Sequence, residues 1–337
     1  VGIHDDLFEL GGDSLSAIQI TARIHAELGQ HLSPALLLQT PTVAEFAGRL
    51  QQAQPAASSP AVAIQPRGQA SPLFWVPGTG GNVIYFQPLA SQLEVTGHPF
   101  YALEPIGVDG REPPRGSVPE IASSYIAALR AVQPHGPYFI GGHSFGSWVA
   151  YELTQQLLDR GEPIERLAVL DTVAPAERDL SVFRGFTGAD WILTLAQLVG
   201  ELRSSPLLLS RERLLECSWE QQLDLLCEAL QAAGYLAPGA TRQQIRGLVE
   251  VYRTQAQMEY RRPPGRPVPI LLLRASERHP DGDVVPPAVR RDPSWGWQAY
   301  ASGDVALEDV PGDHLTMMTH PHVRALAERL RLHLPAR

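Results

Sequence analysis

One pentapeptide, GHSFG at residues 142–146, constrains the fold of this chain more than any other feature. It has the G-x-S-x-G pattern, with an apolar strand candidate at 138–140 before it and an amphipathic helix to about residue 160 after it. A sharp turn from strand to helix lifts the serine hydroxyl above a sheet, and glycines two residues on either side prevent steric clash. We therefore predict that Ser144 is a nucleophile. The Phe145 amide, at a helix start, is predicted to donate to a developing oxyanion.

Short apolar runs alternate with helical patterns from about residue 72 onward. The runs at 73–76, 167–170 and 269–273 are continuous, which is typical of strands buried on both faces. Such runs between helices predict a mostly parallel sheet in an α/β fold. Between about residues 184 and 262 the pattern is helical, with no strand candidate. Because this stretch is too long for an ordinary crossover, we interpret it as an inserted helical lid over the site.

The acid that a serine nucleophile needs should follow it in the chain, and a histidine base should follow the acid. Asp171 ends the next strand candidate after Ser144, and the interval is long enough for one helix and one strand. The rival acids are Glu277, Asp281 and Asp283, which follow a later strand candidate. We choose Asp171, against the alternative that it only caps the start of a loop.

Eleven histidines compete for the role of base. His314 follows the strand-like residues 305–308 and precedes the terminal helix, which is late enough in the chain for the expected order. His320 and His322 lie at the start of that helix, and we expect them to cap or solvate it. His143 is the neighbour of the serine and cannot face its hydroxyl, so we interpret it as a packing residue. We predict that His314 is the base.

The second oxyanion donor should come from the turn after the early strand at 73–76. The glycine-rich turn at 77–81 follows that strand directly, and the amide of Gly78 is our candidate. A glycine-rich turn can also cradle phosphate. This one lacks both the G-x-G-x-x-G pattern and a lysine, so the sequence gives the phosphate interpretation little support.

Composition excludes several classes of protein. All 27 basic residues are arginine, so Schiff-base chemistry and a lysine-containing phosphate loop are excluded. The net charge of −9 argues against nucleic-acid binding. No apolar run reaches the length of a membrane span, and no signal peptide is visible, so we expect no membrane partner. The two cysteines, Cys217 and Cys227, fit a reducing cytoplasm, and with no nearby histidine pattern they predict no metal site.

The composition also divides the chain into two domains. Residues 53–71 are rich in Ala, Pro, Ser and Gln and read as a linker, although the run at 61–64 could instead be an edge strand of the second domain. Residues 1–52 before the linker read as short helices around a thin core. We expect that a preceding helix of this domain is missing from the chain. Residues 72–337 form the second domain.

Ser14 is a second serine of a different kind. It follows Asp13 at the first turn of a predicted helix, and no base is placed to activate it. Free amides and the dipole at a helix start stabilise a phosphate ester, so Ser14 reads as a modified residue and not as a catalytic one. Taken alone, it could equally be a helix-capping serine.

The stretch HDDLFELGGDSL at residues 4–15 closely resembles the carrier domains of nonribosomal peptide synthetases, with similar carriers in polyketide synthases. The stretches at 32–34 and 39–43 resemble the later helical region of the same family. The resemblance implies that Ser14 carries 4′-phosphopantetheine as a covalent cofactor. It also implies that the first helix of the family is missing here.

Residues 72–334 resemble the type I thioesterase domains that end such assembly lines. The resemblance implies an α/β-hydrolase with a helical lid, in which Ser144 and His314 fall on the nucleophile and the base. The family places its acid after the strand that follows the elbow helix, which supports Asp171. The Pro77-Gly78 step falls on its oxyanion loop.

Together the two resemblances imply a chain-terminating thioesterase. An acyl or peptidyl thioester on Ser14 would be transferred to Ser144 and released by hydrolysis or cyclisation. The partners implied are upstream synthetase modules, a phosphopantetheinyl transferase and the tethered substrate. The alternative is a free-standing serine esterase or lipase acting on diffusible esters, and an inert binding module or an editing enzyme that clears stalled chains are further alternatives.

The lid carries one apolar stripe at helical spacing, formed by Trp191, Ile192, Leu195 and Leu198. The stripe could line an acyl tunnel. Packing of the lid against the core explains the same spacing at least as well.

Overall fold

The computed structural model describes most of the chain. The described residues are 2–8, 10, 16, 20, 23–24, 36–37, 40–52, 59–175, 180–202, 206–233, 241–278 and 289–335. Ser14, Asp281 and Asp283 therefore lie outside the described residues, as does most of the helix predicted after Asp13.

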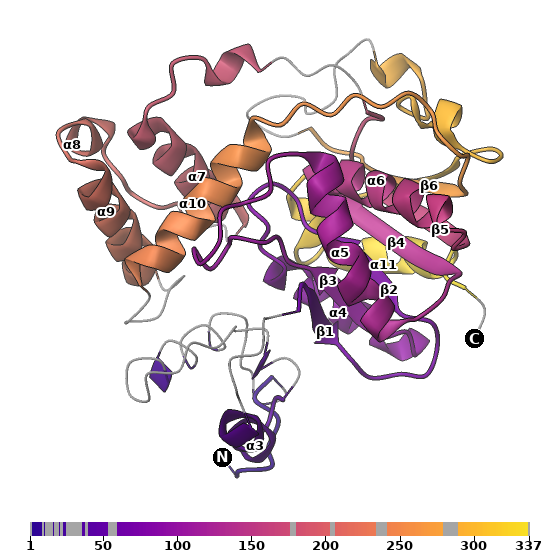
Figure 1. The fold of residues 1–337 in the computed structure, drawn as a ribbon, viewed down its shortest axis with the longest axis horizontal. Coiled ribbons are helices and arrows are strands. Elements are labelled where there is room, and N and C mark those ends of the chain that lie inside the picture. Colours follow the sequence, from indigo (N-terminus) through magenta and orange to yellow (C-terminus); the bar gives the residue numbers. More distant parts are fainter. Residues whose placement is uncertain are drawn as a thin grey trace.

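A seven-stranded sheet forms the centre of the described structure, with the strand order β1-β3-β2-β4-β5-β6-β7 (Figure 1). Every neighbouring pair is parallel except β1 and β3, which are antiparallel. The strands are β1 Ala61–Gln65, β2 Leu73–Val76, β3 Phe100–Leu103, β4 Tyr138–His143, β5 Ile164–Leu170, β6 Ile270–Ala275 and β7 Ala306–Val310. The prediction of a mostly parallel sheet in an α/β fold is confirmed.

The start of the sheet differs from the predicted organisation. β1 lies within the stretch that we assigned to a linker at 53–71, so the alternative interpretation of an edge strand agrees with the structure there. All five residues of β1 are buried, because the strand pairs with β3 and covers its outer edge. β3 was not predicted. Its four residues lie between Pro99 and Glu104-Pro105.

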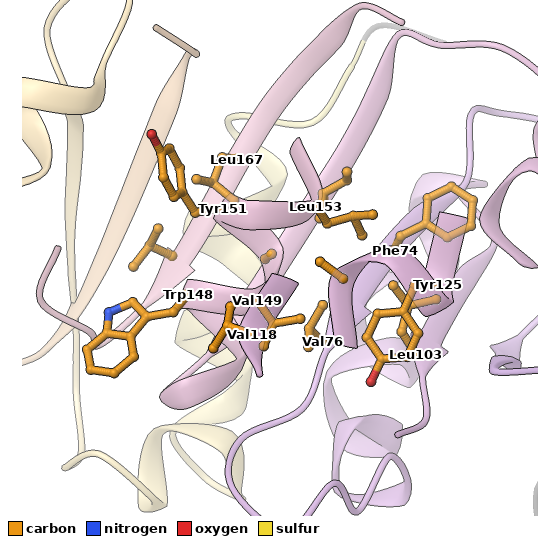
Figure 2. Packing of buried hydrophobic residues seen from close by; sticks show 14 of the residues in the cluster. Phe74, Val76, Leu103, Val118, Tyr125, Trp148, Val149, Tyr151, Leu153 and Leu167 are labelled. Carbon is orange, nitrogen blue, oxygen red and sulfur yellow. The ribbon is translucent and has the colours of Figure 1, made fainter. Parts of the chain in front are cut away.

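Helices cover both faces of the sheet. α5 Val118–Val132 and α6 Phe145–Asp159 pack on one face, and α4 Gln87–Leu93 and α11 Val323–Arg331 pack on the other (Figure 1). Strand side chains alternate between the two layers. In β2, Phe74 faces α5 and α6, as Figure 2 shows, whereas its neighbour Trp75 belongs to the opposite cluster. The sheet is therefore buried on both faces, which explains the continuous apolar runs in the sequence.

The described residues between β5 and β6 contain four α-helices and no strand, so the predicted helical insertion is confirmed. These helices are α7 Gly188–Leu202, α8 Arg211–Leu215, α9 Trp219–Ala232 and α10 Arg242–Ala256. We call residues 188–256 the lid. Buried side chains of the lid helices pack on one another in a hydrophobic cluster of their own. Among the helices described, none is long and apolar enough to cross a membrane.

The N-terminal segment is described only in part. α3 Val43–Gln52 begins directly after Thr42, whose hydroxyl accepts a hydrogen bond from the Glu45 N–H at 3.2 Å. Leu37 and Phe46 are buried. The side chains packed against this pair are Phe8, Ile20, Ile24 and Leu36. The described part is thus a small helical core.

Candidate active site

The candidate site lies at one edge of the sheet, where the parallel strands end. β2, β4, β5 and β7 finish there, and they are followed by the turn at 77–81, the elbow at 144–146, Asp171 and the loop at 311–315. The carboxyl ends of parallel strands are the usual position for a binding or catalytic site in an α/β sheet. The strand order therefore brings together segments that are far apart in the sequence.

Ser144 occupies a strained turn between β4 and α6. Its φ of 55° and ψ of −133° lie outside the regions that a residue with a side chain normally adopts. The neighbouring backbone is so close that a Cβ on Gly142 would lie 2.4 Å from the Gly146 carbonyl oxygen. A Cβ on Gly146 would lie 2.3 Å from the Pro77 carbonyl oxygen. The predicted steric need for both glycines is confirmed.

His314 and Asp171 are directly hydrogen-bonded. The distance from His314 Nδ1 to Asp171 Oδ2 is 2.8 Å, and both residues are buried. The other Asp171 oxygen accepts the Ala275 N–H at 2.7 Å, which fixes the carboxylate plane. A carboxylate oxygen accepts, so Nδ1 of His314 donates to Asp171, and Nε2 lies on the other side of the ring. This is the orientation that a histidine base requires.

The rival candidates lie elsewhere or outside the described residues. Glu277 braces the loop that carries His314: its Oε1 accepts the Gly312 N–H at 3.1 Å, and its own N–H donates to the Gly312 carbonyl at 3.0 Å. Asp281 and Asp283 are not described. His320 is exposed, as we expected. His322 is the N-cap residue of α11, but its side chain makes no capping hydrogen bond.

The two predicted oxyanion donors differ in their surroundings. Phe145 is the first residue of α6, so its N–H belongs to the free amides at the start of a helix. The Gly78 N–H instead donates to the Tyr85 hydroxyl at 3.0 Å. Within the part of the chain that the structure describes, no acceptor is recorded for the next amide in the turn, that of Thr79. Gly78 does lie beside the nucleophile, since a Cβ on it would be 3.4 Å from Ser144 Cβ.

Sequence reasoning missed the polar role of His143. This side chain is buried, and its Nε2 lies 2.8 Å from the His314 carbonyl oxygen. Its Nδ1 lies 3.1 Å from the Tyr85 hydroxyl. The expectation that His143 only packs is therefore wrong. No local pattern could have revealed these partners, because Tyr85 precedes His143 by 58 residues and His314 follows it by 171.

Sequence reasoning also missed a contact between the lid and the turn at 77–81. Gln255, near the end of α10, is buried, and its Oε1 accepts the Gly80 N–H at 2.9 Å. Earlier in α10, a Cβ on Gly247 would lie 2.3 Å from the Gly110 nitrogen. Helix α10 therefore packs closely on the loops beside the site.

The apolar stripe of the lid packs inside the lid. Trp191, Ile192 and Leu195 are buried in the lid cluster, and Leu198 packs against it from the side. The Trp191 ring stacks on Phe183 with 5.1 Å between ring centroids. The stripe therefore packs and does not line an acyl tunnel. Its partners belong to the lid cluster itself, and not to the core under the lid as we expected.

No cluster of His, Cys, Asp or Glu that could hold a metal ion occurs among the described residues. Ser14, the predicted attachment residue, lies outside the described residues. The described N-terminal residues form the small helical core around Leu37 and Phe46. That core agrees with a helical carrier domain.

A mostly parallel sheet, a strained serine elbow and a helical insertion after β5 define an α/β-hydrolase with a lid. Residues 71–333 match the family model described as thioesterase domain, and the chain belongs to this family. Residues 1–50 match the model described as phosphopantetheine attachment site, so the chain also has a carrier domain for that cofactor.

Similar proteins are large synthetases. Chondramide synthase of Chondromyces crocatus is 30% identical over 98% of this chain, and indigoidine synthase of Dickeya dadantii is 36% identical over 53%. A four-domain nonribosomal peptide synthetase crystallised with AMP and glycine covers all of this chain, with a TM-score of 0.72 and 27% identity. The Vlm2 thioesterase domain covers 82% of this chain and matches over its own full length, with a TM-score of 0.58 and 26% identity.

The chain spans only a small part of these relatives. It covers 8% of chondramide synthase, 12% of indigoidine synthase and 25% of the four-domain synthetase. The relatives are multidomain synthetases, so they give the free-standing esterase no support.

Proposed function

We propose that this chain is the last carrier and the thioesterase of a nonribosomal peptide or hybrid assembly line. In this proposal, residues 1–52 present an acyl or peptidyl thioester and residues 72–337 release it, and the helical insertion predicted at about residues 184–262 contains the lid. One observation supports the proposal most strongly: the Asp171–His314 hydrogen bond of 2.8 Å lies at the same sheet edge as the strained Ser144 elbow.

The phosphopantetheine arm supplies the thioester bond through which the substrate is tethered, and we propose Ser14 as its attachment residue. The family match to residues 1–50 supports this assignment. A phosphopantetheinyl transferase would install the arm, and upstream synthetase modules would load the acyl chain. A cytoplasmic location is part of the same proposal, on the two cysteines discussed above.

Acyl transfer begins at Ser144. The His314 Nε2 lone pair accepts the hydroxyl proton while the serine oxygen attacks the thioester carbonyl carbon. Asp171 holds the imidazole and stabilises its positive charge. The carbon–sulfur bond then breaks, and the thiol leaves with the proton from His314, so that the acyl group remains as an ester on Ser144.

The Phe145 amide and an amide of the turn at 77–81 would stabilise the tetrahedral oxyanion, each donor contributing about 2.7–4 kcal/mol. Gly78 is the donor that we predicted, and it can serve only if its N–H leaves the Tyr85 hydroxyl. The neighbouring Thr79 amide is the alternative. A Thr79→Pro variant removes that N–H and should lower kcat strongly only if Thr79 is the donor.

The acyl ester is released by a second attack. His314 removes a proton from water or from a nucleophile within the acyl chain, and that oxygen or nitrogen attacks the ester carbonyl carbon. The bond to the Ser144 oxygen then breaks, and His314 returns the proton to that oxygen. Water gives a linear acid, and an internal nucleophile gives a ring. The two products differ by the mass of one water, so mass spectrometry distinguishes them.

Intact-mass analysis tests the proposal. The chain is loaded with an acyl thioester by a phosphopantetheinyl transferase and followed with time. We expect Ser14→Ala to abolish loading and Ser144→Ala to load normally but to retain the acyl chain. Ser124→Ala is a matched control, because its hydroxyl donates to the Ile121 carbonyl within its own helix α5. Release from Ser144→Ala would disprove the mechanism, and no loading of the parent chain would favour the free-standing esterase.

A further inference from the structure

His143 lies between the nucleophile and the base but belongs to neither role. It is the last residue of β4 and precedes Ser144 directly. Its ring lies beside that of His314, with 4.8 Å between the ring centroids. Both of its nitrogens have a partner, the His314 carbonyl at 2.8 Å and the Tyr85 hydroxyl at 3.1 Å. The imidazole is therefore fully engaged.

The partners fix the position of each proton. A backbone carbonyl only accepts, so Nε2 of His143 carries a hydrogen and donates it to His314. Burial, followed by the nearby His314, lowers the pKa of His143 to about 3, so the ring is neutral and Nδ1 has a lone pair. Tyr85 must then donate to Nδ1. Burial raises the pKa of Tyr85, which keeps that proton in place.

The Tyr85 oxygen completes the chain by accepting the Gly78 N–H at 3.0 Å. The hydrogen bonds therefore run in one direction, from Gly78 to Tyr85 to His143 to the His314 carbonyl. They join the turn after β2, the end of β4 and the loop after β7. These three segments supply the candidate oxyanion turn, the elbow and the base.

We propose that Tyr85 and His143 are positioning residues whose hydrogen bonds hold the backbone of His314 and the oxyanion turn in register with Ser144. This inference rests on the proposed function and deepens it. Asp171 orients the imidazole of His314 through Nδ1, whereas His143 anchors the backbone of the same residue.

An apolar side chain of similar size could fill the space of His143 but could not replace its hydrogen bonds. It would leave the His314 carbonyl and the Tyr85 hydroxyl without partners in a buried place. Glutamine is different, because its amide carries an N–H donor and an oxygen acceptor on one carbon. The imidazole arranges its donor and acceptor nitrogens around Cε1 in the same way, so glutamine can reproduce both hydrogen bonds.

The test compares His143→Leu, His143→Gln and Tyr85→Phe with the parent chain on a small acyl thioester. We expect His143→Leu to lower kcat about 10- to 100-fold with KM unchanged, because the base is displaced relative to the nucleophile. We expect His143→Gln to recover activity to within about fivefold of the parent chain. Tyr85→Phe should lie between them. A role in packing alone predicts the reverse order, with the apolar variant the more active.

A second measurement does not depend on activity. In the ¹⁵N spectrum of histidine-labelled parent chain, His143 is the ring whose signals disappear in His143→Gln. We expect a neutral ring with the proton on Nε2 throughout pH 5–8. A charged ring, or a proton on Nδ1, would overturn the inference.

The inference and the proposed function fail in different ways. If the parent chain neither releases acyl chains nor reacts with a fluorophosphonate at Ser144, the proposed function is wrong and the inference falls with it. If the parent chain is active and His143→Leu keeps its full kcat, only the positioning role is wrong.

Discussion

The lid differs in its hydrophobic core from the rest of residues 59–335, which we call the body. In the body, buried side chains fill both faces of one sheet, and helices α5, α6, α4 and α11 cover them. In the lid, every member of the hydrophobic cluster comes from residues 183–256. Polar contacts such as Gly80 to Gln255 and Gly110 to Gln243 connect the lid with the body. The lid therefore has a core that can persist while its position on the body changes.

The difference separates two tasks. All the proposed catalytic groups lie in the body, where strand ends and tight turns fix them. The lid contributes Gln255, which binds the backbone of the turn at 77–81. Changes in the body should thus alter the chemical step, whereas changes in the lid should alter how the turn and the substrate are held.

The largest effect is expected for Asp171→Asn. The new side chain can still accept the Ala275 N–H through its oxygen, but it presents an amide NH₂ to His314 Nδ1. That favours the imidazole with its proton on Nε2, which cannot act as a base, and kcat should fall about 10⁴-fold. Thiol release from a small acyl thioester measures the effect.

The matched control is Asp190→Asn in the lid. Asp190 accepts hydrogen bonds from Thr187 and Arg211 at the start of α7, and we assign it no part in the reaction. It should keep kcat close to that of the parent chain. Equal losses in the two variants would contradict the division between body and lid.

Two buried tryptophans test whether the cores are separate. Trp191 lies in the lid cluster and Trp297 in the body cluster. Replacing either tryptophan by alanine should lower the free energy of unfolding by about 3–5 kcal/mol. With Trp191→Ala, hydrogen exchange should increase only in residues 188–256, since the lid loosens alone. With Trp297→Ala, it should increase across the sheet. Exchange that spreads to β4 and β5 in Trp191→Ala would show one shared core.

A smaller effect is expected for Gln255→Ala. The Gly80 N–H loses its buried acceptor, and the turn at 77–81 becomes less fixed, so kcat/KM should fall about 5- to 30-fold. Gln243→Ala is the control, because that exposed side chain donates instead to the Gly110 carbonyl, at 3.3 Å. It should change kcat/KM less than about twofold. If both variants behave alike, the contact at Gly80 has no special role.

The smallest effect concerns pH and Glu104, which follows β3. Burial, and then the charge of Asp109, raises the pKa of this carboxyl from 4.5 to about 7. The folded chain therefore keeps a proton that the unfolded chain loses, and stability falls as pH rises from 4.5 to 7. Glu104→Gln should raise the melting temperature by about 2–4 °C at pH 8.

Below pH 4.5 the advantage of Glu104→Gln should vanish, because Glu104 is then protonated in both states. Thermal unfolding at a series of pH values measures this. A constant difference between the two proteins at all pH values would mean that Glu104 titrates normally.

Local patterns in the sequence predicted much of the site. The elbow is a contiguous motif, and the strand ends at Asp171 and before His314 follow from apolar runs and the expected order of the groups. The structure brings Asp171 and His314 within hydrogen-bonding distance, as the prediction requires. The motif at Ser14 was equally local, and its place in the structure stays a prediction.

The missed features depend on distant parts of the chain. Gln255 looks like any polar residue of an amphipathic helix, and only the folded chain places it against Gly80. His143 has the same difficulty, because its two partners lie in a short helical turn after β2 and in the loop after β7. β3, a strand of four residues, was also missed. Contacts between residues that are distant in the sequence cannot be inferred from the local sequence pattern.

The contact between Gln255 and Gly80 sets a rule for exchanging lids among related thioesterases. A transplanted segment must bring an acceptor at the position of Gln255, or the recipient turn loses a partner that its own body cannot replace. It must also keep a glycine at position 247, where any side chain would collide with the backbone at Gly110. Hybrid proteins that meet both conditions should fold with the transplanted lid. The lid could then be exchanged without changing the catalytic residues of the body.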